Sequence, residues 1–237
     1  MVDAGLGHTC VLLDTGQVRC WGQGGLGQNG YPGNPVVGDD ETPGSVGPVD
    51  LGAGRTATAI SSTNQHTCAI LDTRQVRCWG AGTVGRLGYA NENNVGDDET
   101  PGSVGPVDLA GGRTARAITA GGAHTCAILD TGQVRCWGNA GVGAIGSGNT
   151  TTIGDNETPG SAPPVDIGTG RTAVAITAGG AHTCAILDTG QVRCWGLGTA
   201  GRLGTGDTAT IGDNETPGST PPVDIGAGRT AVAITAG

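Results

Sequence analysis

Residues 8–22 read HTCVLLDTGQVRCWG, and nearly the same words begin again at His66, His124 and His182. The histidines, the paired cysteines and the tryptophan of each copy are spaced by 58 residues from those of the next copy. A period of this length is typical of solenoids, propellers and other repeat arrays. We therefore divide the chain into one repeat domain of four units. The predicted units are 6–63, 64–121, 122–179 and 180–237, with residues 1–5 overlapping the pattern of the C-terminus.

Each unit predicts about four short strands and no helix. The run TAVAITAGG (172–180) alternates small and large residues, as a half-buried strand does. The repeated fifteen-residue stretch reads as a hairpin, because two alternating runs flank Asp-Thr-Gly, and glycine suits a left-handed turn position. PPVDIG (163–168) adds a strand entered through proline. The predicted fold class is all-β, a β-propeller of four four-stranded antiparallel blades.

The two ends of the chain match one another in sequence. VDAG (2–5) corresponds to ITAG (234–237), so the chain begins and ends within a unit. We expect the N- and C-terminal half-blades to pair and close the ring, because closure hides sheet edges that would otherwise promote aggregation.

Composition limits the classes of partner. The chain of 237 residues has 48 glycines and 12 prolines, which we assign to turns, and no phenylalanine. All 12 basic residues are arginine and the net charge is −9, which disfavours a nucleic-acid partner. No apolar run approaches the roughly 20 residues that cross a bilayer, so we expect no membrane association. No signal peptide precedes the repeats, which predicts a cytosolic chain or a mature or recombinant piece of a longer one.

The stretch AGGAHTCAILDTGQVRCWGLGTAGRLG (178–204) and its copies resemble the repeat family of the regulator of chromosome condensation, in its bacterial, cysteine-containing branch. The resemblance implies propellers that bind protein partners through loops on one face. Family functions range from nucleotide exchange to light reception and β-lactamase inhibition, and none transfers residue by residue. Members resemble seven-bladed rings, whereas this chain has four units. It would close as a four-bladed ring or, as we favour, as an eight-bladed head-to-tail homodimer.

The cysteines come in pairs ten residues apart. Counting outward from the three-residue hairpin loop places the two cysteines opposite each other, where a cross-strand disulfide forms. Such bridges indicate an oxidising, extracellular or periplasmic origin. Eight reduced thiols, or a metal site formed by His-x-Cys, are the alternatives, but the spacing differs from that of zinc sites. The predicted disulfides are Cys10–Cys20, Cys68–Cys78, Cys126–Cys136 and Cys184–Cys194.

Other repeated residues have a structural and a functional interpretation. The four histidines would either form a ring near the axis that binds a metal or senses pH, or cap backbone groups where the strands bend; their repetition favours the second. The loops GDDETPG and GDNETPG favour turns, with calcium binding as the weaker alternative. We expect Arg19, Arg55 and their copies to pair with these acids, and the tryptophans to pack between blades. The alternative calcium ligands are Asp39, Asp40, Glu41, Asp97, Asp98 and Glu99.

A specific surface should break the repeat symmetry, which it does in the Gly-rich stretch after each hairpin. Tyrosine and arginine, enriched at interaction hot spots, occur there. We predict a non-enzymatic binding or scaffold module with a protein partner, without catalytic residues or cofactors. The alternatives are a purely structural, recently amplified or engineered repeat protein, and an enzyme in the central channel, which near-identical units disfavour. The nominated ligand-binding residues are Gln28, Tyr31, Arg86, Tyr89, Asn91 and Asn93.

Overall fold

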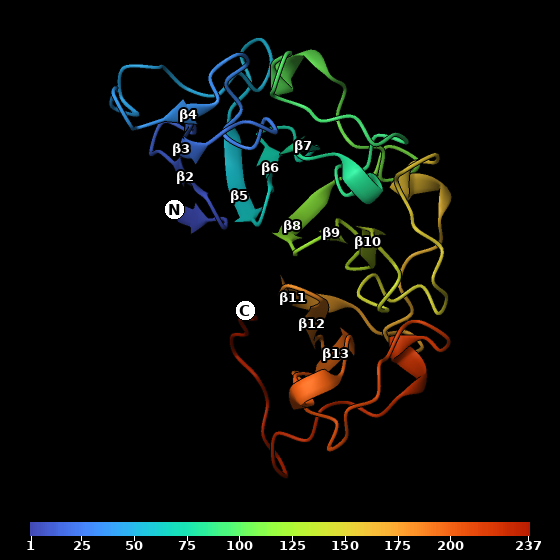
Figure 1. The fold of residues 1–237 in the computed structure, drawn as a ribbon. Coiled ribbons are helices and arrows are strands. Elements are labelled where there is room, and N and C mark those ends of the chain that lie inside the picture. The colour runs from blue at the N-terminus through green and yellow to red at the C-terminus, as the bar shows by residue number, and fades with distance from the viewer.

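The computed structural model describes all residues 1–237 and contains four antiparallel sheets that follow one another around an open arc (Figure 1). Sheet 1 comprises β1 (Val2–Ala4), β2 (His8–Leu12), β3 (Val18–Gln23) and β4 (Val36–Val37). Sheet 2 comprises β5 (Ala57–Thr63), β6 (His66–Leu71) and β7 (Val76–Gly80). Sheet 3 comprises β8 (Ala115–Ala120), β9 (His124–Leu129) and β10 (Val134–Gly138). Sheet 4 comprises β11 (Ala173–Ala178), β12 (His182–Leu187) and β13 (Val192–Gly196).

Each sheet has an inner strand followed by the cysteine-bearing hairpin. The inner strands β5, β8 and β11 line the inside of the arc in Figure 1. Each hairpin turns through three residues whose last member has positive φ, which glycine adopts without strain. In sheet 2 this position is held by Arg74 at φ 62°. The repeated sequence therefore gives the same hairpin four times, even where one residue is unfavourable.

The fourth strand of each predicted blade is broken. Sheet 1 has a two-residue outer strand, β4, and the other sheets have single bridges at the corresponding place, as between Gly138 and Ile153. A second contact follows further along, where Val165 bridges to Val134. The outer edge of each sheet is thus covered by two short pieces of chain with a gap between them. That gap becomes important for the pockets described below.

The arc does not close within the chain, contrary to the expected pairing of the terminal half-blades. The two ends face each other across a gap in Figure 1. The reason is that β1 already occupies the inner position of sheet 1, with Asp3 opposite Cys10. The C-terminal residues instead lie beside sheet 4, where the Ala231 amide donates to the Gly190 carbonyl at 2.8 Å and the Ala236 amide to Thr177 Oγ1 at 3.2 Å. They occupy the place of a fifth inner strand without its hairpin.

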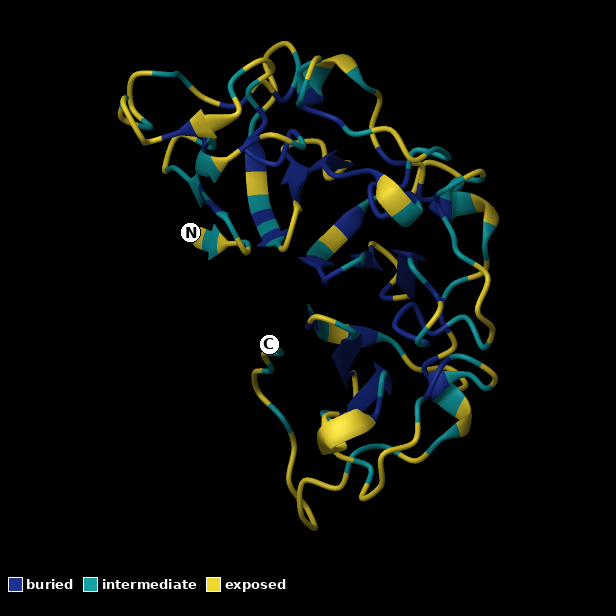
Figure 2. Ribbon diagram, viewed as in Figure 1, coloured by how far each residue is buried: buried dark blue, intermediate teal, exposed yellow.

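The core consists of two hydrophobic clusters, of 22 and 18 buried residues, whereas the loops and the C-terminal segment are mostly exposed (Figure 2). Trp79, Trp137 and Trp195 are completely buried, and they are the largest side chains at the contacts between repeats. Five 3-10 turns are the only helical segments, and none could span a membrane. They are η1 (Thr83–Gly85), η2 (Pro101–Ser103), η3 (Pro159–Ser161), η4 (Thr199–Gly201) and η5 (Pro217–Ser219).

Candidate functional site

The four disulfides are present and each joins the two strands of one hairpin. In sheet 3, Cys126 and Cys136 lie directly opposite each other, with a Cα–Cα distance of 4.1 Å. So short a distance marks a non-hydrogen-bonded pair, whose backbone groups point away from the partner strand. The backbone N–H and C=O of the second cysteine therefore face the broken outer edge of the sheet. No cysteine is free.

The histidines link neighbouring repeats rather than forming an open ring. His66 Nε2 lies 2.9 Å from Thr125 Oγ1 of the next repeat, and that hydroxyl lies 2.8 Å from the Arg86 carbonyl. Because a hydroxyl has a single proton, which the carbonyl receives, the histidine nitrogen must be the donor to threonine. The same pair forms from His8 to Thr67 and from His124 to Thr183, at 2.8 Å each. Histidine thus caps a threonine of the next repeat, not the backbone at the strand bend.

Burial favours the neutral imidazole at these junctions. It lowers the pKa of His8 and of His124 to about 4, and lowers the pKa of His66 well below its ordinary value. The Nδ1 atoms of His8 and His66 are buried without a hydrogen-bond partner. Protonation would therefore place an unpaired N–H and a charge in the interior. These histidines are structural donors whose charge state is coupled to folding.

The tryptophans pack between repeats, as predicted. The indole N–H of Trp137 donates to the Arg86 carbonyl of the preceding repeat at 2.9 Å. A Cβ on Gly88 of that repeat would lie only 2.8 Å from the indole nitrogen, so the close approach requires glycine. Trp21 has no preceding repeat to pack against and is only partly buried. Tryptophan burial therefore marks a complete junction.

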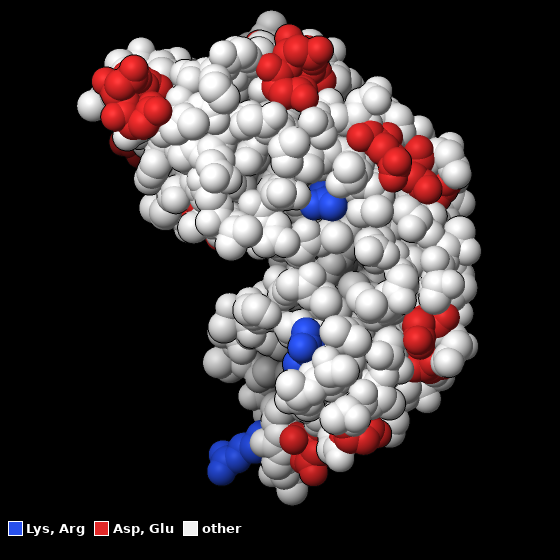
Figure 3. All heavy atoms as spheres, in the orientation of Figure 1, with Lys and Arg blue, Asp and Glu red and all other residues white.

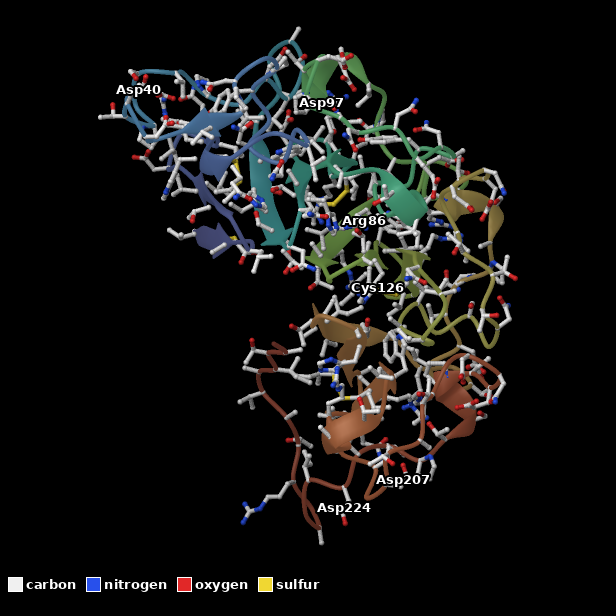
Figure 4. All side chains as sticks on the ribbon, in the orientation of Figure 1. Asp40, Arg86, Asp97, Cys126, Asp207 and Asp224 are labelled. Atoms are coloured by element: carbon white, nitrogen blue, oxygen red, sulfur yellow. A yellow bond between two sulfur atoms is a disulfide. The ribbon has the colours of Figure 1, made fainter.

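The six residues nominated from the sequence do not form one exposed surface. Gln28 and Arg86 are 4% and 8% exposed. Arg86 lies at the heart of a junction (Figure 4), where its guanidinium donates to the carbonyls of Thr83 and, in the next repeat, Gly122. Asn91 holds its own loop by accepting from the Asn93 amide at 2.9 Å. Of the six, only Asn93 is exposed.

The two tyrosines among the six point inward. Tyr89 Oη accepts from the Cys78 amide and donates to the Cys78 carbonyl, both at 3.0 Å. Tyr31 Oη donates to the Gly47 carbonyl at 2.9 Å and lies 3.4 Å from the Cys20 amide. Each phenol therefore fills the gap in the outer strand. Burial raises the pKa of Tyr89 to about 12, which keeps its hydroxyl a donor.

The expected pairing of arginines with the acidic loops is wrong. Arg55 instead pairs with Asp72 in the next hairpin turn, at 3.3 Å, because that turn folds onto it. Arg19 donates to the carbonyls of Pro43 and Gly44 at 2.8 and 3.0 Å. The loop carbonyls satisfy its guanidinium, so no acid is needed there. Arg113 and Arg171 form the ion pair equivalent to that of Arg55. Arg135 and Arg193 donate to loop carbonyls as Arg19 does, whereas Arg77 donates to the Leu51 carbonyl.

The acidic loops lie on the outer edge of the arc, with the few visible basic side chains mostly toward its inner side (Figure 3). Figure 4 labels Asp40 and Asp97 at that edge. The carboxylates of residues 39–41 and of residues 97–99 lie within 4.8 Å of one another in each loop. Asp39 and Asp97 accept from the amides of the residues that follow them, which is a turn interaction. The calcium alternative stays a prediction.

Sequence reasoning missed a pocket in the third repeat. Its volume is about 520 Å³, and it opens where the outer strand is broken. The position equivalent to Tyr31 and Tyr89 is Ser147 here and Thr205 in the fourth repeat. Thr205 borders a second pocket, of about 640 Å³, lined also by Asp207 and Asp224 at the C-terminal end of the arc (Figure 4). The loss of a tyrosine between otherwise similar repeats is the sequence signal that could have found both pockets.

Comparison with known proteins agrees with the repeat pattern. The model of the regulator of chromosome condensation (RCC1) repeat matches residues 2–28, 57–86, 115–144 and 173–202. The ultraviolet-B receptor UVR8 of Arabidopsis thaliana is 31% identical over 210 residues, which are 87% of this chain and 43% of the receptor. The chain therefore spans less than half of that relative.

Two solved structures share the fold. Human WBSCR16 matches with a TM-score of 0.74 and 20% identity, over 100% of this chain and 55% of its own. Yeast RCC1 (Prp20), solved with Kap60 bound, matches with a TM-score of 0.67 and 18% identity, over 91% of this chain and 48% of its own. In each case this chain matches about half of a longer chain.

Proposed function

The chain belongs to the RCC1 repeat family, and from this premise we propose that it is a non-enzymatic module that binds a protein partner through its variable segments. These are residues 23–36, 81–94, 139–152 and 197–210, one after each hairpin. They differ between repeats while the hairpins are nearly identical, so they can distinguish one part of the arc from another. The observation that carries the proposal is this division between a constant framework and variable loops.

The variable segments also lie where a partner can reach them. The 3-10 turns η1 and η4, turquoise and orange in Figure 1, both lie on the face toward the viewer. One equivalent, exposed position holds a different residue in every repeat, which gives each repeat a distinct tip. The tip residues are Pro35, Asn93, Thr151 and Ala209. Loops on a rigid scaffold are where binding residues usually occur.

The proposal is tested by exchanging tips between repeats. In the variant Asn93→Ala, the tip of repeat 2 receives the residue of repeat 4, and the hydrogen bond from the Val84 amide to the Glu92 carboxylate is kept. Affinity capture with quantitative mass spectrometry should find a protein whose recovery falls at least tenfold with this variant. The matched control is Arg74→Gly, which makes an exposed hairpin turn identical to the other three. Equal recovery by both variants, or no captured protein, contradicts the proposal.

A finer proposal concerns the two ends of the arc. The first repeat exposes part of Trp21 and Thr9, the residues that every later repeat buries against its predecessor. The contacts that Nε2 of His8, His66 and His124 makes with a threonine of the next repeat have no counterpart at His182. These surfaces are complementary by the repeat symmetry, and we propose that a second copy joins them into an eight-sheet, head-to-tail ring. The C-terminal segment would then replace β1 beside β2 of the partner.

Molar mass in solution tests this ring directly. Light scattering with free-thiol counting should give the mass of two chains and no reactive thiol. The variant Trp21→Glu should give the mass of one chain, whereas Arg74→Gly should leave the dimer intact. A single-chain mass across the accessible concentrations contradicts the dimer and leaves the binding proposal standing. The four disulfides support an oxidising, extracellular location for either form.

A further inference from the structure

The pocket of the third repeat is lined by Ser147, which stands where repeats 1 and 2 have a tyrosine. Its loop has the same hydrogen bonds as the loop of repeat 2: the Asn149 side chain donates to the Ser147 carbonyl and accepts from the Thr151 amide, as Asn91 does around Tyr89. The backbone path is therefore kept while the phenol is absent. Ser147 Oγ turns to the Asn149 carbonyl at 3.0 Å instead of reaching the sheet.

The polar groups that a phenol would satisfy face this pocket. On either side of Cys136, Gly138 bonds outward to Ile153 and Val134 bonds outward to Val165. The alternation of an antiparallel ladder makes the N–H and C=O of Cys136 point the same way. Cys136 lines the pocket, and in repeat 2 the Tyr89 hydroxyl bonds both backbone groups of the equivalent cysteine. The backbone N–H and C=O of Cys136 can therefore bond one hydroxyl group, the N–H as donor and the C=O as acceptor.

The walls suit an aromatic ring with a cationic substituent. Ile145, Ile153 and Val165 line the pocket, and so do the acidic residues Glu157 and Asp166. The Asp166 carboxylate also accepts from the Gly168 amide and the Thr216 hydroxyl. Thr216 of the fourth repeat borders it, so the site lies at a complete junction. Its volume of about 520 Å³ is within the range of small-ligand sites and exceeds that of a phenol ring, which leaves room for a substituent.

We propose that this pocket binds a para-substituted phenol bearing an amine, with the ring between the three aliphatic residues and the hydroxyl on the backbone of Cys136. The hydroxyl accepts from the N–H and donates to the C=O, as Tyr89 does one repeat earlier. The ammonium group lies toward Glu157 and Asp166. Thr151, the loop tip of the third repeat, also lines this pocket, whereas the tip variant proposed above to test protein binding lies in repeat 2.

Tyramine is the probe, and its two relatives are the controls. Calorimetric titration of the whole chain should show tyramine binding at least tenfold more tightly than phenethylamine, which lacks the hydroxyl, because a buried donor and acceptor are then left unpaired. 4-Hydroxyphenylacetate, with the opposite charge, should also bind more weakly. A short peptide with an N-terminal tyrosine distinguishes the source: tighter binding than tyramine assigns the site to a polypeptide end, weaker binding to a free phenolic amine.

Two variants connect the binding to this pocket. Ser147→Tyr should abolish the tyramine site, because it installs the side chain that repeats 1 and 2 already accommodate. Tyr89→Ser should add a tyramine site in repeat 2. Disulfide content and circular dichroism confirm that both variants are folded. Equal binding of tyramine and phenethylamine, an unchanged titration in Ser147→Tyr, or no tyramine binding at ~10 mM overturns the proposal.

Discussion

The junction between repeats 2 and 3 and the free surfaces at the two ends of the arc are built from equivalent residues with different surroundings. At the junction, Trp137 is fully buried and His66 donates to Thr125. At the ends, Trp21 is partly exposed and His182 lacks the contact with a threonine that the other three histidines make. This difference in burial and hydrogen bonding indicates that a repeat of this kind is stabilised mainly by its neighbour, because its own small sheet cannot bury its large side chains.

Acid should disturb the junctions most. The pKa of His8 and of His124 is about 4 in the folded chain and near 6.5 unfolded. A depressed histidine pKa means that the unfolded state binds more protons below pH 6.5, so stability is full above that pH and falls toward pH 4. We expect a loss of roughly 2–3 kcal/mol for each histidine between pH 7 and 4.5.

Urea unfolding at a series of pH values measures this loss. His124→Asn should flatten the pH dependence, whereas the matched change at the end of the arc, His182→Asn, should flatten it less. A free energy of unfolding that is constant between pH 7 and 4.5 would contradict the prediction that the junction histidines are neutral in the folded chain.

Among substitutions, replacing tryptophan by alanine should give the largest difference in stability loss between the junction and the end of the arc. Trp137→Ala removes a fully buried indole and its hydrogen bond to the Arg86 carbonyl, which should cost about 3–5 kcal/mol of unfolding free energy. Trp21→Ala should cost about 1 kcal/mol, since part of that side chain already contacts water. Chemical denaturation compares the two variants. Equal losses would mean that the first repeat is as fully packed as the third.

The stability lost on removing a disulfide should, in contrast, be the same at the junction and at the end of the arc. The bridges Cys126–Cys136 and Cys10–Cys20 close loops of the same length, with a sequence separation of 10. In the chain-entropy model they restrict the unfolded state equally, by about 2–3 kcal/mol. We expect the double alanine variants C126A/C136A and C10A/C20A to lose similar stability in urea. A markedly larger loss at sheet 3 would show that the bridge also supports the junction.

Replacing the junction threonine should have the smallest effect on stability of these variants, because it changes only two hydrogen bonds. Thr125→Val keeps the side-chain shape but leaves the His66 N–H and the Arg86 carbonyl without this partner, at a cost of about 1–3 kcal/mol. Thr9→Val at the exposed end should change stability by less than about 0.5 kcal/mol. Thermal or urea unfolding of both variants decides. If Thr125→Val leaves the stability unchanged, the hydrogen bonds from His66 to Thr125 and from Thr125 to the Arg86 carbonyl do not stabilise the junction.

Local features were predictable from the sequence because they depend on spacing. Counting from the hairpin loop placed Cys10 opposite Cys20, and the structure has that register. Features that depend on where a side chain points were not predictable in this way. Tyr31 and Arg86 are residue types enriched at binding surfaces, yet Tyr31 bonds within its own repeat and Arg86 bonds across a junction to Gly122. The residue types were informative, but their direction is decided by tertiary packing.

Closure failed as a prediction for a related reason. The match between residues 2–5 and 234–237 identifies two candidates for one inner-strand position, and sequence cannot rank them. In the structure the nearer candidate, β1, pairs with β2, a few residues away. Local pairing costs less chain entropy than joining the two ends. The pocket at Ser147 is a similar case, since its meaning depends on what tyrosine does in another repeat.

All four disulfides join residues within a single hairpin, and none crosses from one repeat to the next. Under a stretching force applied to its two ends, the chain would therefore yield sheet by sheet, since no covalent bond holds adjacent sheets together. Each released repeat would lengthen by less than its full contour, because the ten-residue span inside the bridge stays closed. Reducing the disulfide would release the enclosed residues, and the extended chain would lengthen by up to about 3.5 Å for each of them.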